Sequence, residues 1–170
     1  MRAIGKVIAS MAAGLLWPGL AHADICADMR AIHAQAQSHF DGWKKDRGQG
    51  AYGAAFMLDG AADCSIGADS NGYSCVWKFA TPVDMGRAYV RMVDEIKACP
   101  PLLKEQPAIL NEKPDDRSQG DLRRSMEVTG FDYADAEVTV LVGQMQLTGA
   151  KAGLARNELK FSFIKAAAHN

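Results

Sequence analysis

The sequence predicts an α+β domain, a two-layer sandwich in which an antiparallel β-sheet of about five strands carries two amphipathic helices on one face, in the order α-β-β-α-β-β-β. Three observations lead to this prediction. Two segments space their apolar residues three and four apart, as one face of a helix requires. Other segments are short and alternate apolar with polar residues, as half-buried strands do. The chain has four cysteines, an even number that suits two structural disulfides.

Residues 1–23 have the three parts of an export signal. Arg2 and Lys6 form a basic start, an apolar run follows over 7–17, and Ala21-His22-Ala23 places small residues where a signal peptidase reads. The apolar run is too short for a permanent transmembrane helix. We therefore expect residues 1–23 to be a cleaved signal peptide. Residues 24–170 are then a single disulfide-stabilised α+β domain that is periplasmic or secreted and has no transmembrane segment.

Cys26 follows the expected cleavage site closely, which raises the alternative of a lipid-anchored chain. The residues before it are Asp24 and Ile25, an acid and a bulky side chain, whereas a lipoprotein signal has small residues there. An exported product without a lipid anchor is therefore the preferred interpretation.

The first helix is predicted over 24–45. Its apolar residues recur at steps of three or four, and they are Ile25, Met29, Ile32, Ala36, Phe40 and Trp43. Asp24 can cap the N-terminus, Lys44 and Lys45 suit the negative C-terminal end, and Gly48 can end the helix.

A flexible connector is expected over 48–53, followed by extended segments at 56–58 and 61–66. A strand is predicted over 73–79, because Tyr73, Cys75, Trp77 and Phe79 are large or apolar at every second position.

The hairpin between these strands predicts one disulfide. If the two ends of the glycine-bearing turn at 67–72 pair, the antiparallel register places Cys64 directly opposite Cys75, where the Cβ separation can suit a disulfide. Cys26 is then left to pair with Cys99. The second pairing requires helices that cross or point in opposite directions, because helices running parallel along one sheet would separate these two cysteines.

The segment Thr81-Pro82-Val83-Asp84 predicts the start of the second helix. It offers a hydroxyl cap, a proline at the first helical position and an acid in the first turn. The apolar stripe of this helix consists of Met85, Tyr89, Met92, Ile96 and Cys99, and Pro100-Pro101 ends it.

Polar and extended segments make up the remainder of the chain. Residues 102–110 can add a short extended piece, although Pro107 argues against a central strand. The polar stretch 111–121 is expected to be a solvated loop or ribbon tip. Three strands are then predicted, at 125–131, 136–147 and 158–165.

The charge balance excludes some partners. Lys and Arg total 19 against 20 Asp and Glu, for a formal net charge of −1. Cleavage of the signal removes two basic residues and no acid, so the mature chain is more acidic. This balance gives no electrostatic reason to expect nucleic acid or an anionic membrane as a partner.

No catalytic, cofactor or metal site is predicted. His33 and His39 lie about 240° apart around the expected helix, so they cannot share a metal there. A solvated or locally bonded histidine is expected instead. The cysteines lack a Cys-x-x-Cys spacing, and the motifs of hydrolases, phosphate loops and dinucleotide sites are absent from the sequence.

We expect an exported protein that binds rather than catalyses, of the protein-binding, inhibitor or immunity type, with another periplasmic or secreted protein as its partner. The candidate partner surface lies at the 67–72 hairpin tip and around 111–124, and its residues are Asp69, Asn71, Arg117, Arg123 and Arg124. Two adjacent arginines at 123–124 suit an acidic partner.

Two alternatives remain open. The protein can be a carrier for a small ligand, lipid or metabolite, with an apolar pocket lined by Trp43, Tyr52 and Phe56, although such aromatics more often fill a core. It can also be an unrecognised hydrolase, whose paired carboxylates would come from distant positions.

Overall fold

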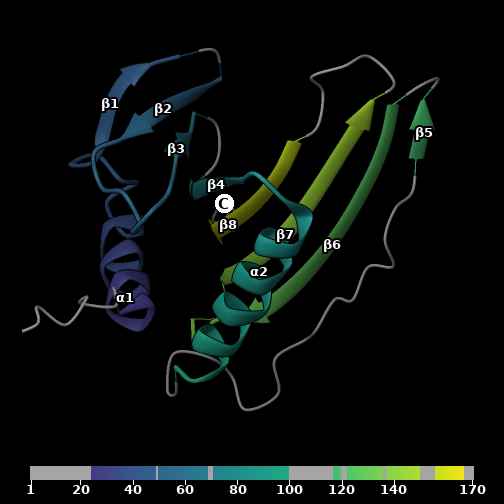
Figure 1. The fold of residues 1–170 in the computed structure, drawn as a ribbon. Helices are drawn as coiled ribbons and strands as arrows, with labels where there is room; N and C mark the ends of the chain where they lie inside the picture. The colour runs from purple at the N-terminus through teal and green to yellow at the C-terminus, as the bar shows by residue number, and fades with distance from the viewer. Residues whose placement is uncertain are drawn as a thin grey trace, which may run out of the picture.

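The computed structural model describes residues 24–48, 50–68, 71–99, 117–119, 122–135, 137–149 and 156–166. These residues form one eight-stranded antiparallel sheet and two helices (Figure 1). The α+β class is confirmed, but the described sheet has eight strands rather than about five. Four of them precede the second helix instead of two, and four follow it instead of three. The expected signal peptide at 1–23 lies outside the described residues.

The strands follow the order β1-β2-β3-β4-β8-β7-β6-β5 across the sheet. The helices are α1 (Ile25–Ala36) and α2 (Pro82–Lys97), and the strands are β1 (Lys44–Arg47), β2 (Ala51–Ala54), β3 (Asp63–Gly67), β4 (Asn71–Phe79), β5 (Arg117–Gln119), β6 (Leu122–Asp132), β7 (Val138–Gly149) and β8 (Arg156–Lys165). Neither of these helices combines the length and apolarity that a membrane span needs.

The first helix is shorter than predicted, because it ends at Ala36. His39 and Phe40 have φ angles of 55° and 60°, in the left-handed region, which a right-handed helix does not contain. The N–H of Phe40 bonds back to the carbonyl of Gln35 at 2.9 Å, so the chain turns here. Phe40 still packs inward and is fully buried. Its apolar spacing therefore reflects a packed turn, not more helix.

Both edges of the sheet contain a strand that the sequence did not indicate. The predicted connector at 48–53 includes the turn and β2 of a β1–β2 hairpin, and β2 also pairs with β3. The predicted extended segment at 56–58 lies outside the strands. At the other edge β5 falls within the predicted polar loop and pairs with β6. Both edge strands are short and rich in polar residues, which limits pairing with other chains.

The disulfides have the predicted pairing. Cys64 lies directly opposite Cys75 in the β3–β4 register, with the Cα atoms 4.1 Å apart. Cys26 is bonded to Cys99, with a Cα separation of 5.5 Å. This second disulfide joins the start of α1 to the chain just after α2, so the two helices meet at these ends.

The core lies between the helices and one face of the sheet, called here the inner face. In Figure 1 strands β6, β7 and β8 curve around α2. One buried row crosses five strands through the paired residues Phe131, Val140, Phe163, Tyr73 and Ile66. The buried residues of α1 and α2 belong to this core, and they are Met29, Ile32, Ala36, Met85, Tyr89, Val93 and Ile96. The outer face of the sheet is covered by neither helix.

Candidate functional site

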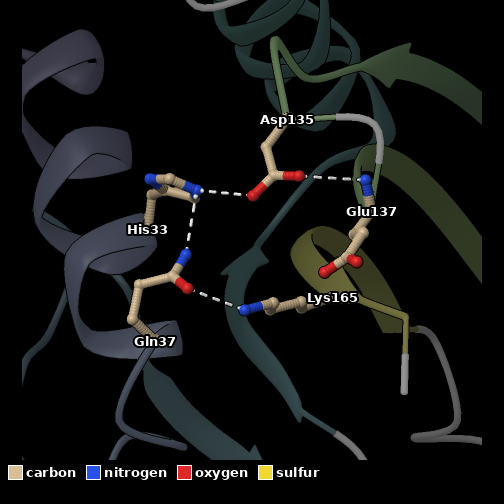
Figure 2. A network of polar contacts seen from close by, with 5 residues as sticks. All are labelled: His33, Gln37, Asp135, Glu137 and Lys165. Carbon is tan, nitrogen blue, oxygen red and sulfur yellow. Dashed lines mark hydrogen bonds and ion pairs between the residues drawn. The ribbon is translucent and has the colours of Figure 1, made fainter. Parts of the chain in front are cut away.

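A polar network joins α1 to the β6–β7 turn and to β8 (Figure 2). The Nε2 atom of His33 lies 3.0 Å from Oδ2 of Asp135, and the backbone N–H of Glu137 donates to Oδ1 of Asp135 at 3.1 Å. Lys165 donates from Nζ to Oε1 of Gln37 at 2.8 Å. The Nε2 atom of Gln37 lies 3.2 Å from the same histidine nitrogen. The network therefore connects the helix layer to the sheet layer.

The contact with Asp135 determines that the Nε2 atom of His33 carries a proton. Lys165 orients the Gln37 amide with its oxygen toward the ammonium group, so the amide NH₂ faces His33. A carboxylate requires a proton on the histidine Nε2, whereas the amide requires a lone pair there. The hydrogen bond with His33, followed by the one from the Glu137 N–H, lowers the pKa of Asp135. Asp135 is therefore a carboxylate at neutral pH, and His33 donates to it.

The geometry of this network favours a structural role. The His33 ring packs against Tyr133 and Phe163, with centroid distances of 5.0 and 6.2 Å. A His–Asp pair acts as a catalytic base when a nucleophile bonds to the second ring nitrogen. Among the hydrogen bonds of the described residues, none joins His33 to a hydroxyl or thiol group. His33 is thus bonded to a distant part of the chain rather than solvated or locally bonded, and sequence reasoning did not single out its partner Asp135.

A second set of polar side chains lies on the inner face of the sheet, next to the first turns of α2. The inner face of the β6–β7 ribbon is apolar as far as the Thr129–Val142 pair and polar in the next two pairs. A cavity of about 260 Å³ lies there, lined by Pro82, Met85 and Gly86 of α2 and by Ser125, Glu127, Gln144 and Gln146 of the strands. This cavity was not predicted.

Two hydrogen bonds organise this region. Gln144 donates from Nε2 to Oε2 of Glu127 at 2.7 Å. One row further into the core, the hydroxyls of Tyr89 and Thr129 are 2.6 Å apart. Burial raises the pKa of the Tyr89 phenol against the effect of its bond with Thr129, and the charge of Glu127 raises it further. Tyr89 therefore stays protonated, and it lies between these polar side chains and the apolar core.

The outer face of the same ribbon has the opposite pattern. Side chains alternate along a strand, so Met145 and Leu147 lie on the outer face while Gln144 and Gln146 lie on the inner face. We call the group around them the outer-face patch. Its apolar members, all partly buried, are Val76, Met126, Val128, Leu141, Met145 and Leu147. Its charged members are the exposed Lys78, Arg124, Arg156, Lys160 and Asp63, and the partly buried Glu158.

The structure places the predicted partner-surface residues in different parts of the fold. Arg124 is exposed and belongs to the outer-face patch, with its Nη2 atom 3.5 Å from the sulfur of Met126. Asn71, Arg117 and Arg123 lie in β4, β5 and β6, and only their backbone is described; Asp69 lies outside the described residues.

The three aromatics that suggested a carrier pocket pack on the core. The rings of Trp43 and Phe56 stack with centroids 4.4 Å apart, and Trp43 also meets the edge of Tyr73 at 6.0 Å. Tyr52 is likewise partly buried against the core. These aromatics therefore fill space between the layers, as a core interpretation predicts.

No family model, curated protein or solved structure matches this chain. Within the described ranges, no three His, Cys, Asp or Glu side chains are grouped so that they could hold a metal ion.

Proposed function

We propose that this chain is an exported, non-catalytic protein-binding protein of the inhibitor or immunity type, and that the outer-face patch binds an acidic surface of another periplasmic or secreted protein. One observation supports the proposal best. Beyond the Thr129–Val142 pair, the β6–β7 ribbon has polar side chains toward the helix layer and apolar side chains away from it. Apolar residues that face away from a domain's own core and are rimmed by charges are typical of an interaction surface.

The charge of the patch indicates the kind of partner. The whole chain has a formal net charge of −1, yet four exposed basic side chains and only two acidic side chains, Glu158 and Asp63, surround the apolar centre. A basic face on an acidic molecule attracts and orients an acidic partner during the encounter. The apolar side chains at the centre, Met126 and Met145 among them, would then supply most of the affinity.

The disulfides support this proposal by fixing the scaffold. Cys64–Cys75 ties two neighbouring strands, and Cys26–Cys99 ties the helices to each other. A surface fixed before binding loses less conformational entropy when the complex forms. Disulfides are also compatible with an oxidising compartment outside the cytosol.

Affinity capture with charge-reversal variants tests the proposal. The mature, oxidised protein is immobilised and exposed to periplasmic and secreted extract, in parallel with the double variant Arg156→Glu/Lys160→Glu. The matched control is Val90→Glu, because Val90 is 57% exposed on α2, away from the patch. We expect one acidic protein to bind the wild type and the control, with salt-dependent affinity, and to bind the double variant at least about tenfold more weakly.

Two results would contradict the proposed function. One is repeated capture of nothing at low salt. The other is a partner that binds the double variant as strongly as the wild type while Val90→Glu weakens it, which would move the interface to the helix side.

A further inference from the structure

We propose that the cavity below α2 is a second binding site, which takes a neutral polyhydroxylated molecule, a saccharide or polyol, through Glu127 and Gln144, with Gly86 leaving the room for it. This site is independent of the outer-face patch, because it lies between α2 and the inner face of the sheet.

The inward position of Glu127 is the first observation behind this proposal. Glu127 and Gln144 form a register pair directly beside the buried Thr129–Val142 pair. Glu127 is partly buried, and its side chain lines the cavity. The only hydrogen bond that the described residues supply to Glu127 is the one from Gln144, whereas a carboxylate can accept about four. The remaining acceptor capacity is available in the cavity.

Gly86 is the second, independent observation. A glycine inside a helix destabilises that helix relative to alanine. Packing among the described residues does not require glycine here, because the nearest atom of theirs that a Cβ atom at position 86 would meet is Oε1 of Gln144, at 3.9 Å. That separation is an ordinary van der Waals contact. The glycine therefore keeps open the space in front of the Gln144 oxygen, where a ligand hydroxyl can donate a hydrogen bond.

The chemistry of the lining favours hydroxyl groups over a cation. The side chains of Gln144, Gln146 and Ser125 both donate and accept hydrogen bonds, as a hydroxyl does, and Glu127 accepts them. The cavity also borders the first turn of α2, whose partial positive charge opposes a cation. Met85 supplies an apolar contact for the C–H face of a ring.

The size of the cavity limits the ligand. Its volume is about 260 Å³. Sites for drug-sized molecules begin at about 300 Å³. The cavity therefore suits a single sugar ring or a short polyol better than a large ligand.

Titrations followed by NMR test this site on the oxidised protein, with glucose, N-acetylglucosamine and methylguanidinium as separate probes. We expect saturable shifts of the amide signals of Gly86, Glu127 and Gln144 with at least one of the sugars, and none with methylguanidinium. Glu127→Gln should weaken sugar binding roughly tenfold to a hundredfold, since it removes a hydrogen bond to a charged acceptor.

Variants that fill or strip the cavity sharpen the test. Gly86→Leu should abolish the shifts by filling the space before Gln144, while Val90→Leu on the exposed side of α2 should leave them unchanged. Gln146→Ala provides a second route if Gly86→Leu unfolds the protein. The proposal is overturned if neither sugar gives saturable shifts, if methylguanidinium binds instead, or if sugar shifts persist in both Gly86→Leu and Gln146→Ala.

Discussion

The Cys26–Cys99 disulfide is expected to stabilise this fold more than the Cys64–Cys75 disulfide does. A cross-link lowers the entropy of the unfolded chain, by an amount that grows with the logarithm of the loop it closes. The sequence separations are 73 and 11 residues. This relation gives about 4.5 kcal/mol for the long loop and about 3 kcal/mol for the short one. A difference of about 1.5 kcal/mol is large against a typical net stability of about 5–15 kcal/mol.

Variants that keep one disulfide allow each to be measured separately. The double variant Cys64→Ala/Cys75→Ala retains only the long-loop disulfide, and Cys26→Ala/Cys99→Ala retains only the short one. For each variant, urea unfolding is compared with and without reductant, so the two measurements differ in one S–S bond. The loss of buried volume at Cys64 and Cys75, which are 2% and 0% exposed, then cancels from the comparison.

We expect reduction to lower the free energy of unfolding more in the variant that retains Cys26–Cys99. Equal losses, or a larger loss on breaking Cys64–Cys75, would refute the loop-entropy reasoning. The urea m-value reports the surface exposed on unfolding. If breaking Cys26–Cys99 also lowered the m-value, the native state would already expose more surface, as it would if α1 had detached from the sheet. The packing of α1 through Met29, Ile32 and Ala36 would then be too weak to hold it alone.

Three further predictions concern single residues. Burial, followed by nearby carboxylates, raises the pKa of Asp28, so Asp28→Asn should stabilise the protein at neutral pH, and the gain in urea midpoint should vanish below the ordinary value of 3.8. The hydrogen bond with His33 lowers the pKa of Asp135. The ionised Asp135 therefore stabilises the fold above pH 3.8, and this stabilisation is lost as the pH falls through the lower folded-state pKa. In urea unfolding, Asp135→Asn should cost about 0.5–1 kcal/mol at neutral pH and nothing in stronger acid. Thr81 caps α2 by accepting from the N–H of Asp84 at 3.1 Å, and Thr81→Ala should lower the free energy of unfolding by about 1 kcal/mol whereas Thr81→Ser should change it little.

Local signals and tertiary packing agree in α2, in β4 and at the Cys64–Cys75 pair, and these features were predictable from the sequence. The Thr81 cap and the apolar stripe specify the helix without reference to the rest of the chain. The end of α1 was not predictable in this way. Both a continued helix and a tight turn would bury Phe40, and apolar spacing does not encode the positive φ angles at His39 and Phe40.

The edge strands β1 and β5 were missed for a different reason. A strand is recognised in a sequence when one or both of its faces are buried, because burial imposes apolar alternation. β1 consists of Lys44-Lys45-Asp46-Arg47, and β5 of Arg117-Ser118-Gln119, with no apolar residue in either. Backbone pairing to β2 and β6 defines these strands, and backbone pairing leaves no trace in side-chain hydrophobicity.

The two candidate sites depend on a side-chain pattern that the sequence reveals only in part. Along β7, the inward positions change from Val140 and Val142 to Gln144 and Gln146, while the outward positions Met145 and Leu147 are apolar, as Leu141 is. This change of pattern can be recognised in the sequence of one strand, yet a single strand at a sheet edge can show it without any functional reason. Register makes it meaningful, because β6 changes at the same level, with Glu127 inward and Met126 outward. Two adjacent strands that exchange faces together cannot both bury their far halves in the domain's own core. We therefore propose one face there for a polar ligand and the other for an acidic partner protein.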